Sequence, residues 1–91
     1  MIEETRQRIL VVDDDVALRG LIASYLEANG FMVDGAGDGR EMRVAINRHP
    51  PDLIVLDLML PGEDGLSLLR GLRATGGPPV IMVSARGDEV D

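Results

Sequence analysis

The sequence predicts a doubly wound α/β fold, in which a parallel sheet carries helices on its faces. Four short apolar segments alternate with segments of helical periodicity, which is the pattern of βαβ units. Most of the apolar segments are unbroken, as is typical of strands that are covered on both faces. Three of them end at a polar residue, Asp13, Asp57 or Ser84, and ligand sites of open parallel sheets lie at such strand ends.

The first predicted unit consists of a strand at 9–12 and a helix at 16–29. Apolar residues at spacings of three and four give this helix one stripe that we expect to be buried. The stripe contains Leu18, Leu21, Ile22, Tyr25 and Leu26. Asp15 directly precedes the helix and is interpreted as its N-cap, the alternative being a metal ligand. Asn29-Gly30 supplies a left-handed stop for the helix.

The second predicted strand, at 31–33 with Ala36 beyond it, is weak because polar residues and glycines interrupt it. We therefore expect it at the edge of the sheet. Asp38 and Glu41 form a variant capping box at the start of the next helix, which ends before Pro50. One face of that helix carries Met42, Ala45, Ile46 and His49. His49 is interpreted as part of this face rather than as a metal ligand.

The third strand, at 53–56, is an unbroken apolar run that ends in Asp57. Such a run is typical of a central strand. A helix follows at about 64–75, and glycines and prolines at 76–79 end it. Its expected buried face contains Leu66, Leu68, Leu69 and Leu72. The fourth strand is predicted at 80–83.

The composition of the chain excludes several classes of function. The 91 residues, 45% apolar and 27% charged, are typical of one compact domain. The net charge of −7 argues against direct nucleic-acid binding by this segment, since phosphates would repel it. The chain has no cysteine for thiolate or Cys-based zinc chemistry. Without a secretory signal or a membrane-length apolar run, the expected location is the cytoplasm.

Three carboxylates are the candidate site. If the first and third strands are neighbours, Asp13, Asp14 and Asp57 converge at one edge of the sheet. Carboxylates at close range repel one another unless a cation is present. Oxygen ligands select a hard divalent ion such as Mg²⁺, which leaves coordination positions for phosphate oxygens. Asp57 ends the central strand and is the best candidate for a nucleophile that forms an acyl phosphate.

The motifs resemble a known family. The segments 9–15 (ILVVDDD), 52–62 (DLIVLDLMLPG) and 80–85 (VIMVSA) are similar to those of receiver domains of two-component response regulators. The similarity is greatest to the OmpR type, in which a winged-helix DNA-binding domain follows the receiver. It extends from about Arg8 to Asp91.

The resemblance implies that Asp57 accepts a phosphoryl group from a sensor histidine kinase. It also implies that Asp13 and Asp14 hold Mg²⁺, with Asp57 and the main-chain carbonyl of Met59 as further ligands. Ser84, with Ala85 beside it, would supply the hydroxyl switch that contacts the phosphoryl group. The protein would then be a phosphoacceptor switch that forms homodimers and regulates transcription through a separate DNA-binding domain, rather than a turnover enzyme.

The sequence departs from the family pattern in one important respect. Receivers carry an essential lysine after a fifth strand, and no lysine occurs among these 91 residues. Residues 1–91 are therefore expected to be a receiver that is incomplete at its C-terminus, with strand order 2-1-3-4, an exposed edge at 80–83 and poor phosphorylation. The alternative is a degenerate receiver that acts only as a dimerisation or binding module. An aspartyl-phosphate hydrolase of another family would need an acid where Met59 stands.

Overall fold

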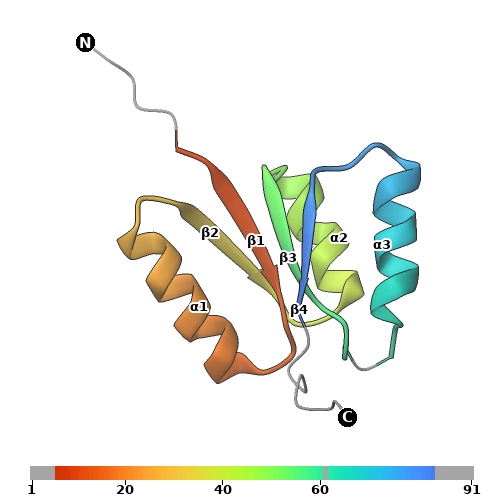
Figure 1. Ribbon diagram of the computed structural model, residues 1–91, viewed down its shortest axis with the longest axis horizontal. Helices are drawn as coiled ribbons and strands as arrows, with labels where there is room; N and C mark the ends of the chain where they lie inside the picture. Colours follow the sequence, from red (N-terminus) through yellow and green to blue (C-terminus); the bar gives the residue numbers. More distant parts are fainter. Residues whose placement is uncertain (1–5, 61, 84–91) are drawn as a thin grey trace.

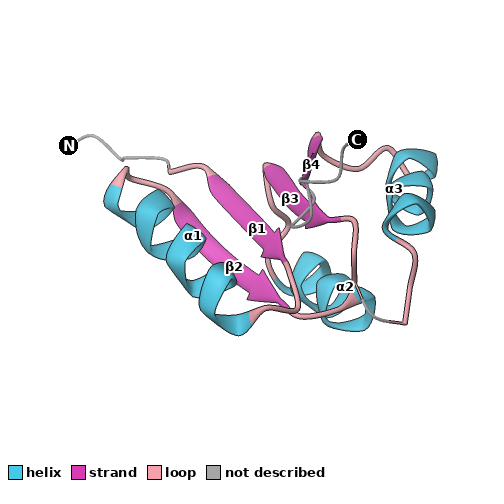
Figure 2. Ribbon diagram, turned by 60° about the horizontal axis from the view of Figure 1, so that its bottom comes forward, coloured by secondary structure: helices cyan, strands magenta, loops and turns pink. Residues whose placement is uncertain are grey.

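The computed structural model describes residues 6–60 and 62–83 (Figure 1). Strands and helices alternate along the chain as predicted. The elements are β1 (Arg8–Val12), α1 (Val16–Ala28), β2 (Met32–Ala36), α2 (Gly39–Arg48), β3 (Leu53–Asp57), α3 (Gly65–Ala74) and β4 (Val80–Val83). The four strands form one parallel sheet in the order β2-β1-β3-β4, and the arrows of β1, β2 and β3 point the same way in Figure 2. The predicted doubly wound topology is confirmed.

The register of the sheet aligns the carboxyl ends of the strands. Val12 pairs with Ala36 of β2 and with Leu56 of β3, and Asp57 pairs with Val83 of β4. The residues that directly follow β1 therefore lie next to the last residue of β3. This alignment places the polar strand ends at a common edge of the sheet.

One face of the sheet carries the main hydrophobic core. Figure 1 shows α2 and α3 on this side and α1 on the other. Side chains alternate between the faces along each strand, so that every second strand residue packs under α2 and α3. The buried cluster consists of Leu10, Val12, Ala36, Met42, Ile54, Leu56, Leu60 and Leu68.

The α1 side is covered less completely, and two predicted core residues are exposed. Leu18, Ile22 and Leu26 are half-buried, but Leu21 and Tyr25 are 68% and 69% exposed. The reason is that α1 packs against β1 and β2, so only the residues that face these strands are covered. The prediction that all five residues of the stripe are buried is wrong for these two.

Two further helix residues depart from the sequence-based expectation. His49 is exposed, because it is the extended C-cap of α2 rather than a residue of its buried face. Leu66 is 46% exposed, because it lies in the first turn of α3, where Leu68 faces the core. β3 is central as predicted, although Val55 is only half-buried.

Local hydrogen bonds define where the helices begin. The side chain of Asp15 accepts from the Leu18 amide, which confirms its N-cap role. Asp38 accepts from the Glu41 amide at 2.8 Å, and Glu41 accepts from the Gly37 amide at 2.7 Å. The capping box is thus a variant in which the glutamate reaches one residue further back than usual.

β2 is longer than the sequence suggested. It continues through Asp34 to Ala36, because its backbone pairs with β1 as far as Val12. The Asp34 carboxylate also forms an ion pair of 2.8 Å with Arg8 of that strand. Gly30, with a φ of 93°, provides the left-handed conformation expected after α1. No helix among the described residues is long and apolar enough to cross a membrane.

Candidate functional site

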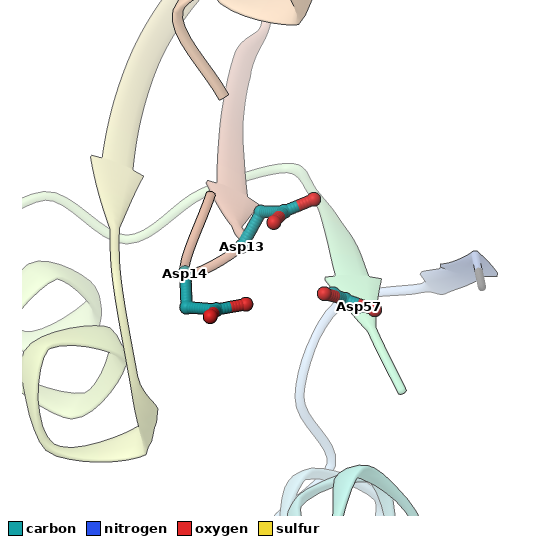
Figure 3. Close-up of side chains that lie close together, drawn as sticks. All are labelled: Asp13, Asp14 and Asp57. Carbon is teal, nitrogen blue, oxygen red and sulfur yellow. The ribbon is translucent and has the colours of Figure 1, made fainter. Parts of the chain in front are cut away.

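The carboxylates of Asp13, Asp14 and Asp57 gather at the carboxyl edge of the sheet (Figure 3). One oxygen from each lies within 4.8 Å of the other two. Asp13 and Asp14 directly follow β1, and Asp57 is the last residue of β3. Asp13 and Asp57 are only 3% and 2% exposed, whereas Asp14 is open to solvent. The structure thus brings together the three acids that the sequence singled out.

Asp13 is held by three hydrogen bonds. Its amide donates to the Ala36 carbonyl at 2.9 Å, its Oδ1 accepts from the Asp15 amide at 2.9 Å, and its carbonyl accepts from Nη1 of Arg19 at 2.7 Å. The first bond ties the residue to the end of β2, and the other two tie it to the start of α1. These bonds restrict the orientation of the Asp13 carboxylate relative to Asp57.

Asp57 is also oriented by the main chain. Its Oδ1 accepts a hydrogen bond of 3.0 Å from the Met59 amide, and the next amide, that of Leu58, donates to the Val83 carbonyl of β4. The side chain of Met59 points away into solvent, with more than half of its surface exposed. Met59 therefore contributes to the site through its backbone amide and not through its side chain. Ser84 and Ala85 lie outside the described residues.

The electrostatics of the site disfavour an additional negative charge. Burial raises the pKa of Asp13, and the charges of Asp57, Asp14 and Asp15 raise it further, while the hydrogen bond from the Asp15 amide acts in the opposite direction. Each of these causes reflects the cost of placing anions together away from water. A hard cation would remove that cost, and carboxylate oxygens are its preferred ligands.

The loop that follows Asp57 is fastened to α2 and α3. Glu63 forms an ion pair of 2.8 Å with Arg43 of α2. A Cβ atom at Gly65 would lie 2.8 Å from the Cα of Leu58, so only glycine allows α3 to begin so close to the end of β3. Neither contact was predicted from the sequence, because each depends on how distant segments pack.

Arg19 was also missed. It lies on α1 near the acids, yet nothing in the local sequence signals that its side chain returns to the Asp13 carbonyl. A groove between α2 and α3, whose lining includes Met42, Ile46, Leu68 and Leu72, contains none of the three carboxylates. It does not alter the location of the candidate site.

The fold, together with the three carboxylates at the edge of the sheet, is that of a known class of protein. The family model of the response regulator receiver domain matches residues 9–91 of this sequence. The chain therefore belongs to the response regulator receiver family, as the sequence motifs indicated.

Individual relatives support this assignment. The DNA-binding response regulator MtrA of Mycobacterium tuberculosis is 46% identical over 86 residues, which cover 94% of this chain and 38% of MtrA. The BeF3-activated N-terminal receiver domain of RstA from Klebsiella pneumoniae has a TM-score of 0.80 and 37% identity, and the match covers 86% of this chain and 67% of that one. The receiver domain of the Francisella response regulator 1452 has a TM-score of 0.81 and 40% identity, with coverage of 93% and 70%. The chain spans 38% of the length of the curated relatives.

Proposed function

We propose that Asp57 accepts a phosphoryl group from a sensor histidine kinase and that this reaction depends on Mg²⁺. The observation that carries the proposal is the convergence of three carboxylates at the ends of two adjacent strands, with Asp57 almost completely buried. A buried acid at a strand end requires an explanation, since the burial of an unpaired charge costs free energy. Membership of the receiver family supplies that reason.

The donor set fits a magnesium ion. Asp13, Asp14 and Asp57 would hold it, with the main-chain carbonyl of Met59 as a further ligand. Mg²⁺ typically takes few protein carboxylates and keeps positions for water and phosphate oxygens, and the exposure of Asp14 leaves the site open on one side. When bound, the ion offsets the negative charge of a transferring phosphoryl group.

The residues of the chain supply position and the nucleophile. The Met59 amide holds one oxygen of Asp57, so the carboxylate presents a constant orientation to an incoming donor. An oxygen of Asp57 forms the new bond to phosphorus as the bond from phosphorus to the donor's imidazole nitrogen breaks, which yields an acyl phosphate. The protein modifies only itself and is a switch rather than a turnover enzyme.

The proposed response involves Ser84 and Ala85, with the Ser84 hydroxyl turning toward the phosphoryl group. Phosphorylation adds a charge of about −2, which is large enough to rearrange the adjacent backbone. Relatives named as DNA-binding response regulators support transcription regulation through a DNA-binding domain as the output. DNA binding is assigned to that domain because this segment is acidic.

The test is the intact mass of the protein after treatment with acetyl phosphate and Mg²⁺, compared with its Asp57→Asn variant. We expect a fraction of the wild-type protein to gain one phosphoryl mass, and the variant to gain none. Equal labelling of both proteins, or no magnesium-dependent labelling at all, would contradict the proposal.

A second function, homodimerisation, is favoured by a specific observation. β4 pairs only with β3 among the described residues, and the side chains of Ile81 and Val83 are exposed. Apolar side chains exposed on one surface are a feature of sites at which chains associate. If the domain is only a dimerisation module, light scattering will show a dimer. That dimer will be equally stable in the wild-type protein and in Asp57→Asn, both with and without acetyl phosphate. A monomeric mass at tens of micromolar would count against dimerisation.

A further inference from the structure

Arg19 joins α1 to the loop that carries the acids. Its Nη1 donates a hydrogen bond of 2.7 Å to the Asp13 carbonyl, while its own amide donates to the Asp15 carbonyl within the first turn of α1. The side chain is half-buried. A long cationic side chain is thus held beside three anions without bonding to their carboxylates.

Two glycines provide the space for this side chain. A Cβ atom at Gly35 would lie 3.2 Å from Cδ and Nε of Arg19, and one at Gly37 would lie 3.3 Å from its Nη1. Neither glycine has a positive φ, so backbone conformation does not explain why they are glycines. The side chain of Arg19 therefore runs across the end of β2 and fills the room that the glycines leave.

Charge pairing alone does not account for this arrangement. Among residues 6–60 and 62–83, Arg19 takes part in no ion pair, and its hydrogen bond goes to a neutral carbonyl. That carbonyl belongs to a residue whose amide and Oδ1 are also anchored. The bond to Arg19 completes the restraint on the backbone of Asp13.

We infer that Arg19 is a positioning residue for the magnesium site, holding the backbone of Asp13 so that its carboxylate faces Asp57. This inference rests on the proposed function. Residues that orient metal ligands are typically worth about 10- to 100-fold in metal affinity. A purely electrostatic role would have the opposite sign, since removal of a nearby positive charge strengthens the attraction of a cation to the acids.

The experiment compares Arg19→Ala with Arg70→Ala, which removes the same charge from an exposed position of α3. Isothermal titration with Mg²⁺ should show affinity about tenfold weaker in Arg19→Ala and unchanged in Arg70→Ala. Gly35→Ala, which crowds the guanidinium group without removing it, should weaken binding in the same direction. Equal or tighter binding by Arg19→Ala would overturn the inference.

A second readout needs no metal. Amide hydrogen exchange reports local opening. The amide of Asp13 donates to the Ala36 carbonyl, and the amide of Asp15 donates to Oδ1 of Asp13. In the absence of Mg²⁺ we expect both amides to exchange faster in Arg19→Ala than in Arg70→Ala, by more than the difference between the unfolding free energies of the two variants in urea accounts for. Unchanged exchange would contradict the positioning role, whereas failure of the wild-type protein to bind Mg²⁺ would contradict only the proposed function.

Discussion

The carboxylates of Asp13 and Asp57 face each other across the ends of β1 and β3, with oxygens within 4.8 Å and with almost no exposure to solvent. The parallel register places them there, because Val12 and Leu56 are paired partners and each acid is the next residue along its strand. Two buried anions at this distance destabilise the fold unless something compensates for their charge.

Magnesium should stabilise the protein. A ligand at about 100 times its dissociation constant adds about 2.7 kcal/mol to the unfolding free energy, which for a domain of this size raises the melting temperature by about 10 °C or more. Differential scanning calorimetry with increasing MgCl₂ measures the effect. Asp14→Ala should lose most of the increase, while Glu27→Gln, which removes one exposed charge from α1, should keep it. A similar increase in both variants would rule out a site at Asp14.

The stability of the metal-free protein should depend on the ionisation of Asp13. Burial raises its pKa above the ordinary value of 3.8, so the ionised form costs free energy in the folded state. The stability associated with this shift is complete below 3.8 and is lost as the pH rises through the folded-state pKa. Asp13→Asn is neutral at every pH, and its amide oxygen can still accept the bond from Asp15.

We therefore expect Asp13→Asn to be more stable than the wild type at pH 7 without Mg²⁺, with an advantage that disappears as the pH falls below 3.8. Urea denaturation across the pH range, with EDTA present, checks this. An excess of Mg²⁺ should reverse the order at pH 7. A variant that is less stable than wild type under metal-free conditions would show that the Asp13 charge has a favourable partner.

Two glycines of α3 should respond to alanine in opposite ways. At Gly65 a Cβ atom would lie 2.8 Å from the Cα of Leu58, so the backbone must shift, at a cost of about 1–3 kcal/mol. At Gly71 nothing lies within 4 Å of a Cβ atom, and alanine in a helix is favoured over glycine by about 1 kcal/mol. Urea denaturation of Gly65→Ala and Gly71→Ala should show these opposite signs. Equal effects would mean that α3 can move away from the loop.

Two leucines of α3 should differ as well. Leu68 belongs to the buried cluster, and Leu68→Ala should cost about 2–5 kcal/mol of unfolding free energy. Leu66 is mostly outside the core, and Leu66→Ala should change stability by about 0.5 kcal/mol or less. Thermal and urea unfolding of the two variants test which leucine faces the sheet. A large loss for Leu66→Ala would indicate that another surface covers it.

Much of this protein could be predicted because its patterns are local. Unbroken apolar runs marked β1, β3 and β4, and a weaker run marked the edge strand β2. Asp13, Asp14 and Asp57 could be assigned to one site because parallel strands bring their carboxyl ends to the same edge. The order of the strands then determined which of these ends would be neighbours.

Which apolar residues are buried could not be read from spacing alone. The periodicity of α1 marks a broad stripe, but the position of β1 and β2 beneath it decides that Ile22 is covered and Tyr25 is not. The same applies to Leu66 and Leu68 in α3. Periodicity describes one helix, whereas burial depends on the second surface against which that helix packs.

The sequence by itself determined the order of elements and the three acids, because hydrophobic period and strand ends are properties of contiguous residues. The strand order was implied by the resemblance to receiver domains. Only the tertiary structure decided that Arg19 reaches the Asp13 carbonyl and that Glu63 pairs with Arg43. These contacts depend on the packing of elements and on the rotamers of long side chains, which have many conformations in the unfolded chain. Packing of the helices on the sheet selects one of these side-chain conformations.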